Sequence, residues 1–140
     1  MKYPKKLNKV FVYCDGASRG NPGSAAIAYI IKDKDGHILK QANKHIGECT
    51  NNIAEYKAII EGLNACSSFT RNEVILCSDS NLAIKQISKI WKINKDHLKK
   101  LYFEVKNKES LFNKVTFIHK LRANENIKEV DKLVNKALDS

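Results

Sequence analysis

Four acidic residues stand where a carboxylate could do chemistry. Asp15 follows the β-branched and aromatic run Val10–Tyr13, and Asp79 follows a second apolar run. A carboxylate that ends a buried strand costs free energy unless a cation or a hydrogen-bond donor meets it. Glu55 lies in the first turn of an expected helix, and Asp131 lies within the last one. We predict that these four carboxylates converge and hold divalent metal ions.

Carboxylates that pack together raise one another's pKa and stay ionised only if a cation lies among them. Oxygen ligands favour Mg²⁺ or Mn²⁺ over zinc. Two such ions about 3.5–4 Å apart can stabilise the attacking and leaving oxygens of phosphodiester hydrolysis. Each acid also has a plainer interpretation: Asp15 as a turn former, Glu55 as a partner of the helix dipole, Asp79 as an N-cap and Asp131 as a solvated side chain. Their joint placement at one edge of the sheet favours the metal site.

Composition sets the broad class of the protein. The chain has 140 residues, of which 43% are hydrophobic, and this suits one domain over residues 1–140 with a loose basic lead-in at 1–8. No apolar run is long enough for a bilayer and no signal-type segment is present, so we expect a cytoplasmic monomer. The four cysteines form no C-x-x-C pair, which argues against zinc and favours small buried side chains in a reducing compartment.

The formal net charge is +10 at pH 7. A surplus of this size indicates a polyanionic partner, most often nucleic acid. The alternative is that the lysines serve solubility alone.

The pattern of apolar residues predicts an α/β fold. Its order is β-β-β-α-β-α-α-β-α, with a glycine-rich turn after the first strand and an Asp-Gly hairpin turn after the second. The expected strands are Lys9–Cys14, Ser24–Ile31, 37–48, Glu73–Ser78 and Val115–Ile118. The expected helices begin near Thr50, Asp79, Asn94 and Asn126, with Thr50 and Asn94 as N-cap residues. These elements predict a five-stranded mixed sheet, three strands antiparallel and two parallel, flanked by helices. Ligands bind beyond the carboxyl ends of such strands, where Asp15 and Asp79 meet if their strands are parallel neighbours.

Four segments give the chain a specific resemblance. Val12–Gly23, Thr50–Ala58, Ser78–Ser80 and Val130–Val134 resemble type 1 ribonuclease H, in the same order and with similar spacing. The resemblance implies the ribonuclease H-like fold. It also implies an endonuclease that hydrolyses the RNA strand of RNA–DNA hybrids with two Mg²⁺ or Mn²⁺ ions and leaves 5′-phosphate and 3′-hydroxyl ends.

The resemblance implies roles for the acids. Asp15 would bridge both ions, Glu55 and Asp79 would complete the ion on the leaving-group side, and Asp131 would help hold the ion that activates water. Arg122 is a catalytic candidate for steering the scissile phosphate or releasing product. It lies in the loop where bacterial-type members carry a His, a place that Leu121 occupies here. His119, at the end of the preceding strand, is a weaker candidate for the same role.

The resemblance also implies contacts with the hybrid. Some of these residues would line the minor groove, where 2′-hydroxyls distinguish RNA from DNA, and others would form a pocket for a DNA-strand phosphate. Asn81 stands where members often carry Gln or Glu. The long basic protrusion of some members is absent, and Trp91 with a lysine-rich third helix would take part of its role by holding the DNA backbone. The predicted nucleic-acid contacts are Gly16, Ser18, Gly20, Asn21, Thr50, Asn51, Asn52, Asn81, Trp91 and Lys99. Turn and cap chemistry is the plainer interpretation of the Asn and Ser residues, and ordinary amphipathic packing is that of Trp91 and the lysines.

Three other functions compete with a nuclease that cuts hybrids. A hybrid-binding module without catalysis would keep the fold and the basic face but would need none of the four acids. A 3′–5′ exonuclease or an integrase-like strand transferase would share the metal chemistry but not the segments around Asp15 and Thr50. A metal sensor would need a partner surface, and the sequence indicates none.

Overall fold

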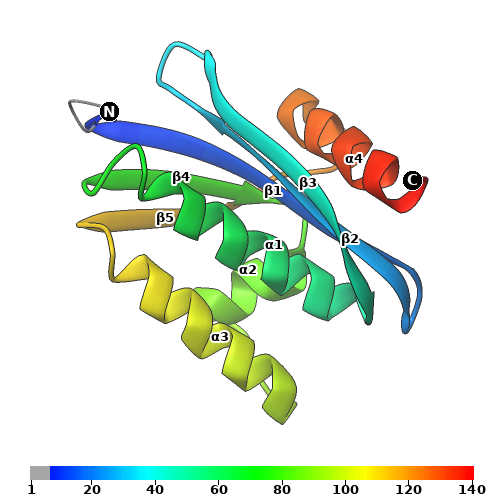
Figure 1. The fold of residues 1–140 in the computed structure, drawn as a ribbon. Helices are drawn as coiled ribbons and strands as arrows, with labels where there is room; N and C mark the ends of the chain where they lie inside the picture. Colours follow the sequence, from blue (N-terminus) through cyan, green and yellow to red (C-terminus); the bar gives the residue numbers. More distant parts are fainter. Residues whose placement is uncertain (1–6) are drawn as a thin grey trace.

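The computed structural model describes residues 7–140, in which five strands and four helices follow the predicted order (Figure 1). The elements are β1 (Lys9–Gly20), β2 (Gly23–Lys32), β3 (Ile38–Cys49), α1 (Asn51–Cys66), β4 (Glu73–Ser78), α2 (Asn81–Ile87), α3 (Asp96–Glu109), β5 (Lys114–His119) and α4 (Glu125–Leu138). The basic lead-in predicted for residues 1–8 lies outside the described residues as far as residue 6. None of the helices in residues 7–140 combines the length and the apolar character needed to span a membrane.

The strands form one mixed sheet in the order β3-β2-β1-β4-β5. β1 pairs antiparallel with β2 and parallel with β4, while β3 pairs with β2 and β5 with β4. The helices α1, α2 and α3 lie on one side of the sheet and α4 lies on the other (Figure 1). The prediction of three antiparallel and two parallel strands flanked by helices is therefore confirmed.

Each face of the sheet buries its own apolar side chains. On the side of α1, Val10, Val12 and Cys14 from β1 pack in one core with Tyr56 and Leu63. On the other side, the small residues of β2 let α4 approach closely. This second core combines Ala26, Ala28 and Ile30 with Val130 and Val134. Period-two alternation in β2 supplies both layers, because Ile27, Tyr29 and Ile31 belong to the first core, as expected of a strand buried on two faces.

The predicted end of the first strand at Cys14 is wrong. β1 continues to Gly20, because β2 pairs with it along its whole glycine-rich half, from Asp15 opposite Ala28 to Gly20 opposite Gly23. The turn is limited to Asn21 and Pro22. The parallel ladder with β4 nevertheless ends at Cys14 and Ser78, so Asp15 still lies at the edge where that pairing stops.

Gly16 allows β1 and α1 to come together. A Cβ at this position would lie 2.2 Å from the carbonyl oxygen of Ala54 and 2.9 Å from the backbone nitrogen of Glu55. Real side chains do not make contacts this short, so only glycine fits. The close approach brings the residue before it, Asp15, beside the first turns of α1.

Helix caps match the predictions in part. Thr50 caps α1 as expected, since its hydroxyl accepts from the backbone N–H of Ile53 at 3.3 Å. Ser80, and not Asp79, is the N-cap of α2. The predicted cap of the third helix by Asn94 is wrong: α3 starts after Lys95 without a side-chain cap, and Asp96 in its first turn complements the helix dipole instead.

Replacing Gly16 by Ala should destabilise the protein by about 1–3 kcal/mol, because the new methyl group pushes α1 away from β1. Chemical denaturation measures this change. Gly36→Asn is the matched control, since Gly36 has φ +85° in open space and asparagine tolerates this conformation. Equal free energies of unfolding for Gly16→Ala and the wild type would contradict the proposed close approach.

Candidate active site

The four predicted acids come from four different elements and face one edge of the sheet. Asp15 lies in β1 just past the parallel ladder, and Asp79 directly follows β4. Glu55 lies near the start of α1, and Asp131 lies in α4 on the opposite side of the sheet. The structure therefore brings the four predicted acids together, with Arg122 from the loop between β5 and α4 among them.

Asp15 is the most deeply buried of these groups, with 3% of its surface exposed. Its pKa is raised to about 9, first by burial, then by the charge of Asp79 and by Asp131, whose side chain is within hydrogen-bonding reach. Arg122 acts in the opposite direction. The carboxyl group of Asp15 is thus held where ionisation costs free energy unless more positive charge is added.

The pKa of Glu55 is also raised, though by less than that of Asp15. Burial raises its pKa to about 7, and the nearby Asp79 adds to this rise. The hydroxyl of Ser80 donates a hydrogen bond to Oε1 of Glu55 at 2.9 Å and partly stabilises the ionised form. The same hydroxyl accepts from the N–H of Ala83 as it caps α2, so the start of this helix orients Glu55.

Asp79 has one satisfied oxygen and one unsatisfied one. Its Oδ2 accepts from Arg122, with Nε at 3.2 Å and Nη2 at 3.0 Å. Its Oδ1 is buried without a hydrogen-bond partner, which is unusual for a carboxylate oxygen. Arg122 also places Nη1 3.9 Å from Oδ1 of Asp131. A single guanidinium thus faces several carboxylates and leaves one buried oxygen free.

The chemistry of this donor set fits a hard divalent cation. It consists of carboxylate oxygens alone, includes the Asp79 oxygen that lacks a partner, and includes Asp15, which ionises only with difficulty.

The spacing of the acids is wider than their chemistry alone would suggest. Among residues 7–140, no three of the four carboxylates have ligand atoms that all lie within 4.8 Å of one another. The acids around Arg122 are therefore spaced more widely than three ligands of one ion would be.

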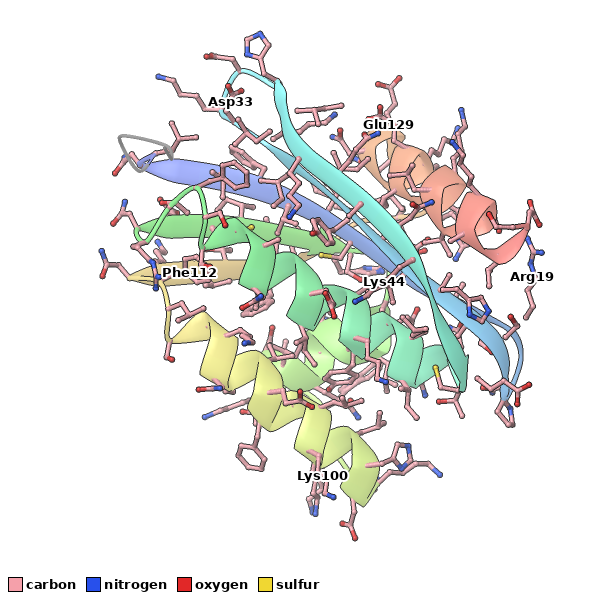
Figure 2. The ribbon with its side chains drawn as sticks, viewed as in Figure 1. Arg19, Asp33, Lys44, Lys100, Phe112 and Glu129 are labelled. Atoms are coloured by element: carbon pink, nitrogen blue, oxygen red, sulfur yellow. The ribbon has the colours of Figure 1, made fainter. Side chains whose placement is uncertain are left out.

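One tighter group of ligand atoms occurs elsewhere in the described residues. Asp33, Asp35 and His37 lie within that distance, in the β2–β3 turn. Figure 2 shows Asp33 at the end of the sheet where β1 begins, away from the carboxyl end of β4. Oδ1 of Asp33 already accepts from the N–H groups of Asp35 and His37, both at 2.9 Å, which lowers the pKa of this exposed carboxyl. These contacts are those of a hydrogen-bonded hairpin turn, which was predicted here.

Four of the residues predicted to contact nucleic acid form a connected group at the start of α1: Ser18, Gly20, Asn21 and Asn51. The N–H of Ser18 donates to Oδ1 of Asn51 at 3.2 Å, and its hydroxyl is placed to donate to the carbonyl of Cys49 (2.8 Å) or to that of Gly20. The N–H of Asn51 donates to Oδ1 of Asn21 at 3.1 Å. The β1–β2 turn is thereby fixed against the N-terminus of α1.

The other predicted contacts lie around this group or away from it. Asn52 is in the first turn of α1, and Asn81 is exposed at the start of α2. Trp91 and Lys99 lie apart from the acids, on the α2–α3 connector and on α3, and both are exposed.

Known proteins are similar to this chain in sequence and in fold. The family described as Reverse transcriptase-like matches residues 13–137. Ribonuclease HI of Halobacterium salinarum is 36% identical over 97% of this chain and 67% of its own length. The crystal structure of RNase H1 from this archaeon superposes with a TM-score of 0.89 at 37% identity, covering 94% of this chain and 98% of that one. The chain belongs to the type 1 ribonuclease H family.

Two further members of the type 1 ribonuclease H family are similar to this chain, one a longer protein and one solved with a bound substrate. The bifunctional protein Rv2228c of Mycobacterium tuberculosis is 34% identical over 94% of this chain, which spans 36% of that protein's length. LC11-RNase H1, solved in complex with an RNA/DNA hybrid, matches with a TM-score of 0.86 at 33% identity over 93% of this chain and 96% of that one.

Sequence reasoning missed two polar side chains of this ribonuclease H-family site. Ser80 orients Glu55, and Asn135 places Nδ2 3.4 Å from Oδ2 of Asp131. His119, the weaker candidate beside Arg122, places Nε2 3.2 Å from the backbone oxygen of Asp79. The i, i+4 spacing of Asp131 and Asn135 on one helix face could have revealed the second of these contacts. Nothing in the sequence distinguishes Ser80 from an ordinary N-cap.

The raised pKa of Asp15 predicts a pH dependence of stability without metal. Unfolded aspartate titrates near about 3.9, whereas the folded group has a pKa of about 9. The folded state holds more protons between these values, so the free energy of unfolding falls as the pH rises. Asp15→Asn should remove this loss, and its advantage over the wild type should grow by at most about 1.4 kcal/mol per pH unit.

Denaturation in EDTA at several pH values between 5 and about 9 measures this effect. Asp139→Asn is the control, because this acid is exposed near the C-terminus and pairs with Arg19. If the free energies of unfolding of the wild type and of Asp15→Asn change with pH in parallel, the raised pKa of Asp15 is ruled out.

Proposed function

We propose that this chain is a metal-dependent endonuclease that hydrolyses the RNA strand of RNA–DNA hybrids and leaves 5′-phosphate and 3′-hydroxyl ends. The observation that carries the proposal is the convergence of four carboxylates and Arg122 in a member of the type 1 ribonuclease H family. The hybrid bound to LC11-RNase H1 supports the choice of substrate. We propose that residues 1–140 act as a single ribonuclease H domain, as a monomer in the cytoplasm.

Asp15, Glu55, Asp79 and Asp131 would hold two Mg²⁺ or Mn²⁺ ions. Such ions, when bound, supply an activated water and stabilise the leaving 3′ oxygen. The chain contributes the fixed positions of its acids: the parallel ladder sets Asp15 and Asp79, while the Ser80 hydroxyl orients Glu55. The unpartnered oxygen of Asp79 and the high pKa of Asp15 both support a cation at this edge.

Arg122 has a separate role in this proposal. Its side chain is 70% exposed although it pairs with Asp79, so it can leave the carboxylates at little cost in packing. A guanidinium released in this way donates two parallel hydrogen bonds to a phosphate. We propose that Arg122 steers the scissile phosphate and assists the release of the product.

Recognition of the hybrid rests on the connected group at the start of α1. Ser18, Gly20, Asn51, Asn52 and Asn81 would follow the minor groove, where the 2′-hydroxyls of the RNA strand lie. Gly16 was also predicted to contact nucleic acid, but it is buried against the backbone of Ala54 and supports this surface from behind. Asn21, Thr50 and Asn52 would receive a DNA-strand phosphate at the N-terminus of α1. The net charge of +10 would attract the substrate, and Trp91 and Lys99 would contact the DNA strand where it leaves the paired region.

A hybrid-binding module without catalysis is the weaker candidate. Binding through the groove contacts needs neither a deeply buried Asp15 nor a buried Asp79 oxygen without a partner. Both features cost free energy, and a protein that only binds gains nothing from them.

The direct test is cleavage of an end-labelled RNA–DNA hybrid with Mg²⁺, with Mn²⁺ and with EDTA, beside single-stranded RNA and duplex DNA. We expect internal cuts in the RNA of the hybrid that require metal. Asp15→Asn should reduce cleavage at least about 100-fold while hybrid binding in EDTA is largely kept. Tight binding of the hybrid by the wild-type protein without any cutting would overturn the proposed activity.

Arg122→Ala should lower turnover about 10–100-fold and change hybrid affinity much less, because the guanidinium acts on the reacting phosphate. Steady-state cleavage combined with binding measured in EDTA separates these effects. Arg71→Ala is the matched control, since this exposed arginine precedes β4, at the end of the strand opposite Asp79. Equal losses in turnover and affinity would make Arg122 a simple binding residue.

A further inference from the structure

A groove separate from the acidic site lies between the α2–α3 connector and the outer face of α3. It encloses about 500 Å³. Its walls combine lysines with large apolar and aromatic side chains. The lining residues are Gln86, Lys89, Ile90, Trp91, Lys92, Ile93, Lys99, Tyr102 and Phe103.

The connector that forms one wall is held in a defined shape. The N–H groups of Ile90 and Trp91 both donate to the carbonyl of Lys85, at 2.8 and 3.1 Å. Lys89, just before them, has φ +63°, a left-handed conformation that costs a lysine about 1 kcal/mol or more. Backbone strain of this kind persists where the surroundings impose it, so the connector presents Ile90 and Trp91 in fixed positions.

A buried hydrogen-bonded pair supports the floor of the groove. The hydroxyl of Tyr56 donates to Oε1 of Gln86 at 2.7 Å, and Nε2 of Gln86 lies 3.4 Å from the carbonyl of Lys92. Both side chains are almost fully buried, Tyr56 at 0% and Gln86 at 5% exposure. This chain of contacts links the connector to the core around α1.

The groove concentrates the exposed apolar surface of the molecule. Six large hydrophobic residues are exposed among residues 7–140, and three of them line this groove: Ile90 at 63%, Trp91 at 44% and Phe103 at 65%. Phe103 packs edge-to-face with Tyr102, with ring centroids 5.3 Å apart. Large apolar side chains gathered in one exposed place mark a binding surface more often than singly scattered ones do.

The charge around this apolar surface is of one sign. Three of the nine lining residues are lysines, and none is acidic. Lys100 continues the basic surface, and Figure 2 shows it at the lower end of α3, where its side chain points away from the sheet. A ligand that fits this groove has flat apolar faces and negative charge, which is the chemistry of nucleotides.

We propose that this groove binds unpaired nucleotides of a single strand that extends beyond the hybrid. The inference rests on the proposed function and adds to it a preference for hybrids with single-stranded ends. Bases within a duplex are already stacked on their neighbours, so they cannot stack on Trp91 or Phe103, whereas unpaired bases can. The lysines contact the phosphates of the same strand.

Trp91 is the single tryptophan of the chain, so its fluorescence reports on the groove directly. The probes, used in EDTA to prevent cleavage, are a blunt hybrid and the same hybrid with a short oligo(dT) or oligo(U) extension, with or without bases. We expect the extension with bases to quench Trp91 and to tighten binding about tenfold, since stacking of one base is worth about that much. The extension without bases should do neither.

Trp91→Ala should reduce the ratio of extended to blunt affinity to about one, while Trp91→Phe keeps most of the ratio because phenylalanine also stacks. Ile38→Ala, which removes an exposed apolar side chain on β3, is the control and should leave the ratio unchanged. Binding and cleavage of the blunt hybrid test the proposed function separately, because neither measurement requires an extension.

Three results would overturn this inference. One is equal affinity for blunt and extended hybrids. Another is complete quenching of Trp91 by the blunt hybrid, which would place the paired strand in the groove. The third is a quench that depends on protein concentration alone, together with dimers in sedimentation, which would make the groove a contact between copies of this chain.

Discussion

The parallel pairing of β1 with β4 is the constraint on which the rest of the site depends. The ladder ends at Cys14 and Ser78, so the next residue of each strand, Asp15 and Asp79, emerges at the same edge of the sheet. Gly16 then lets α1 approach closely enough to add Glu55. Negative charge is thus concentrated by backbone geometry that the two apolar cores stabilise.

Burial and neighbouring negative charge explain why Asp15, the most buried of the four acids, has the most strongly raised pKa. Asp15 is driven toward its neutral form by burial and by Asp79, and Arg122 relieves only part of the repulsion. A protein selected for stability alone would replace one of these carboxylates, since buried unpaired charge is among the costliest features of a fold. The persistence of all four is easiest to understand if a cation completes the site.

Much of the fold could be predicted from the sequence because its signals are local. The run Glu73–Ser78 reads as a buried strand and Thr50 as a helix cap, and both predictions are confirmed. The full length of β1 could not be predicted, because its glycine-rich half is a strand only through pairing with β2. Similarly, the missing cap at Asn94 reflects the connector before α3, whose path is set by its bonds to Lys85 and Gln86.

The sequence could suggest which residues form the candidate site, but not which of their atoms pair with one another. Asp15 and Asp79 could be placed from the strands that precede them, whereas Asp131 gave only a weak signal beside an apolar helix face. The pairing of Arg122 with Asp79 depends on the path of the loop between β5 and α4, which no periodic pattern encodes. The groove beside Trp91 escaped sequence reasoning because no periodic pattern encodes the path of the connector, which brings the exposed side chains of Ile90 and Trp91 beside Phe103.

The measurement that tests the central claim most directly is anomalous X-ray scattering from crystals of the protein soaked in Mn²⁺. The account predicts manganese peaks among Asp15, Glu55, Asp79 and Asp131, with the side chain of Arg122 moved away from Asp79. Manganese at the hairpin turn of Asp33, Asp35 and His37 alone, or Arg122 still paired with Asp79 and no metal beside it, would contradict the account.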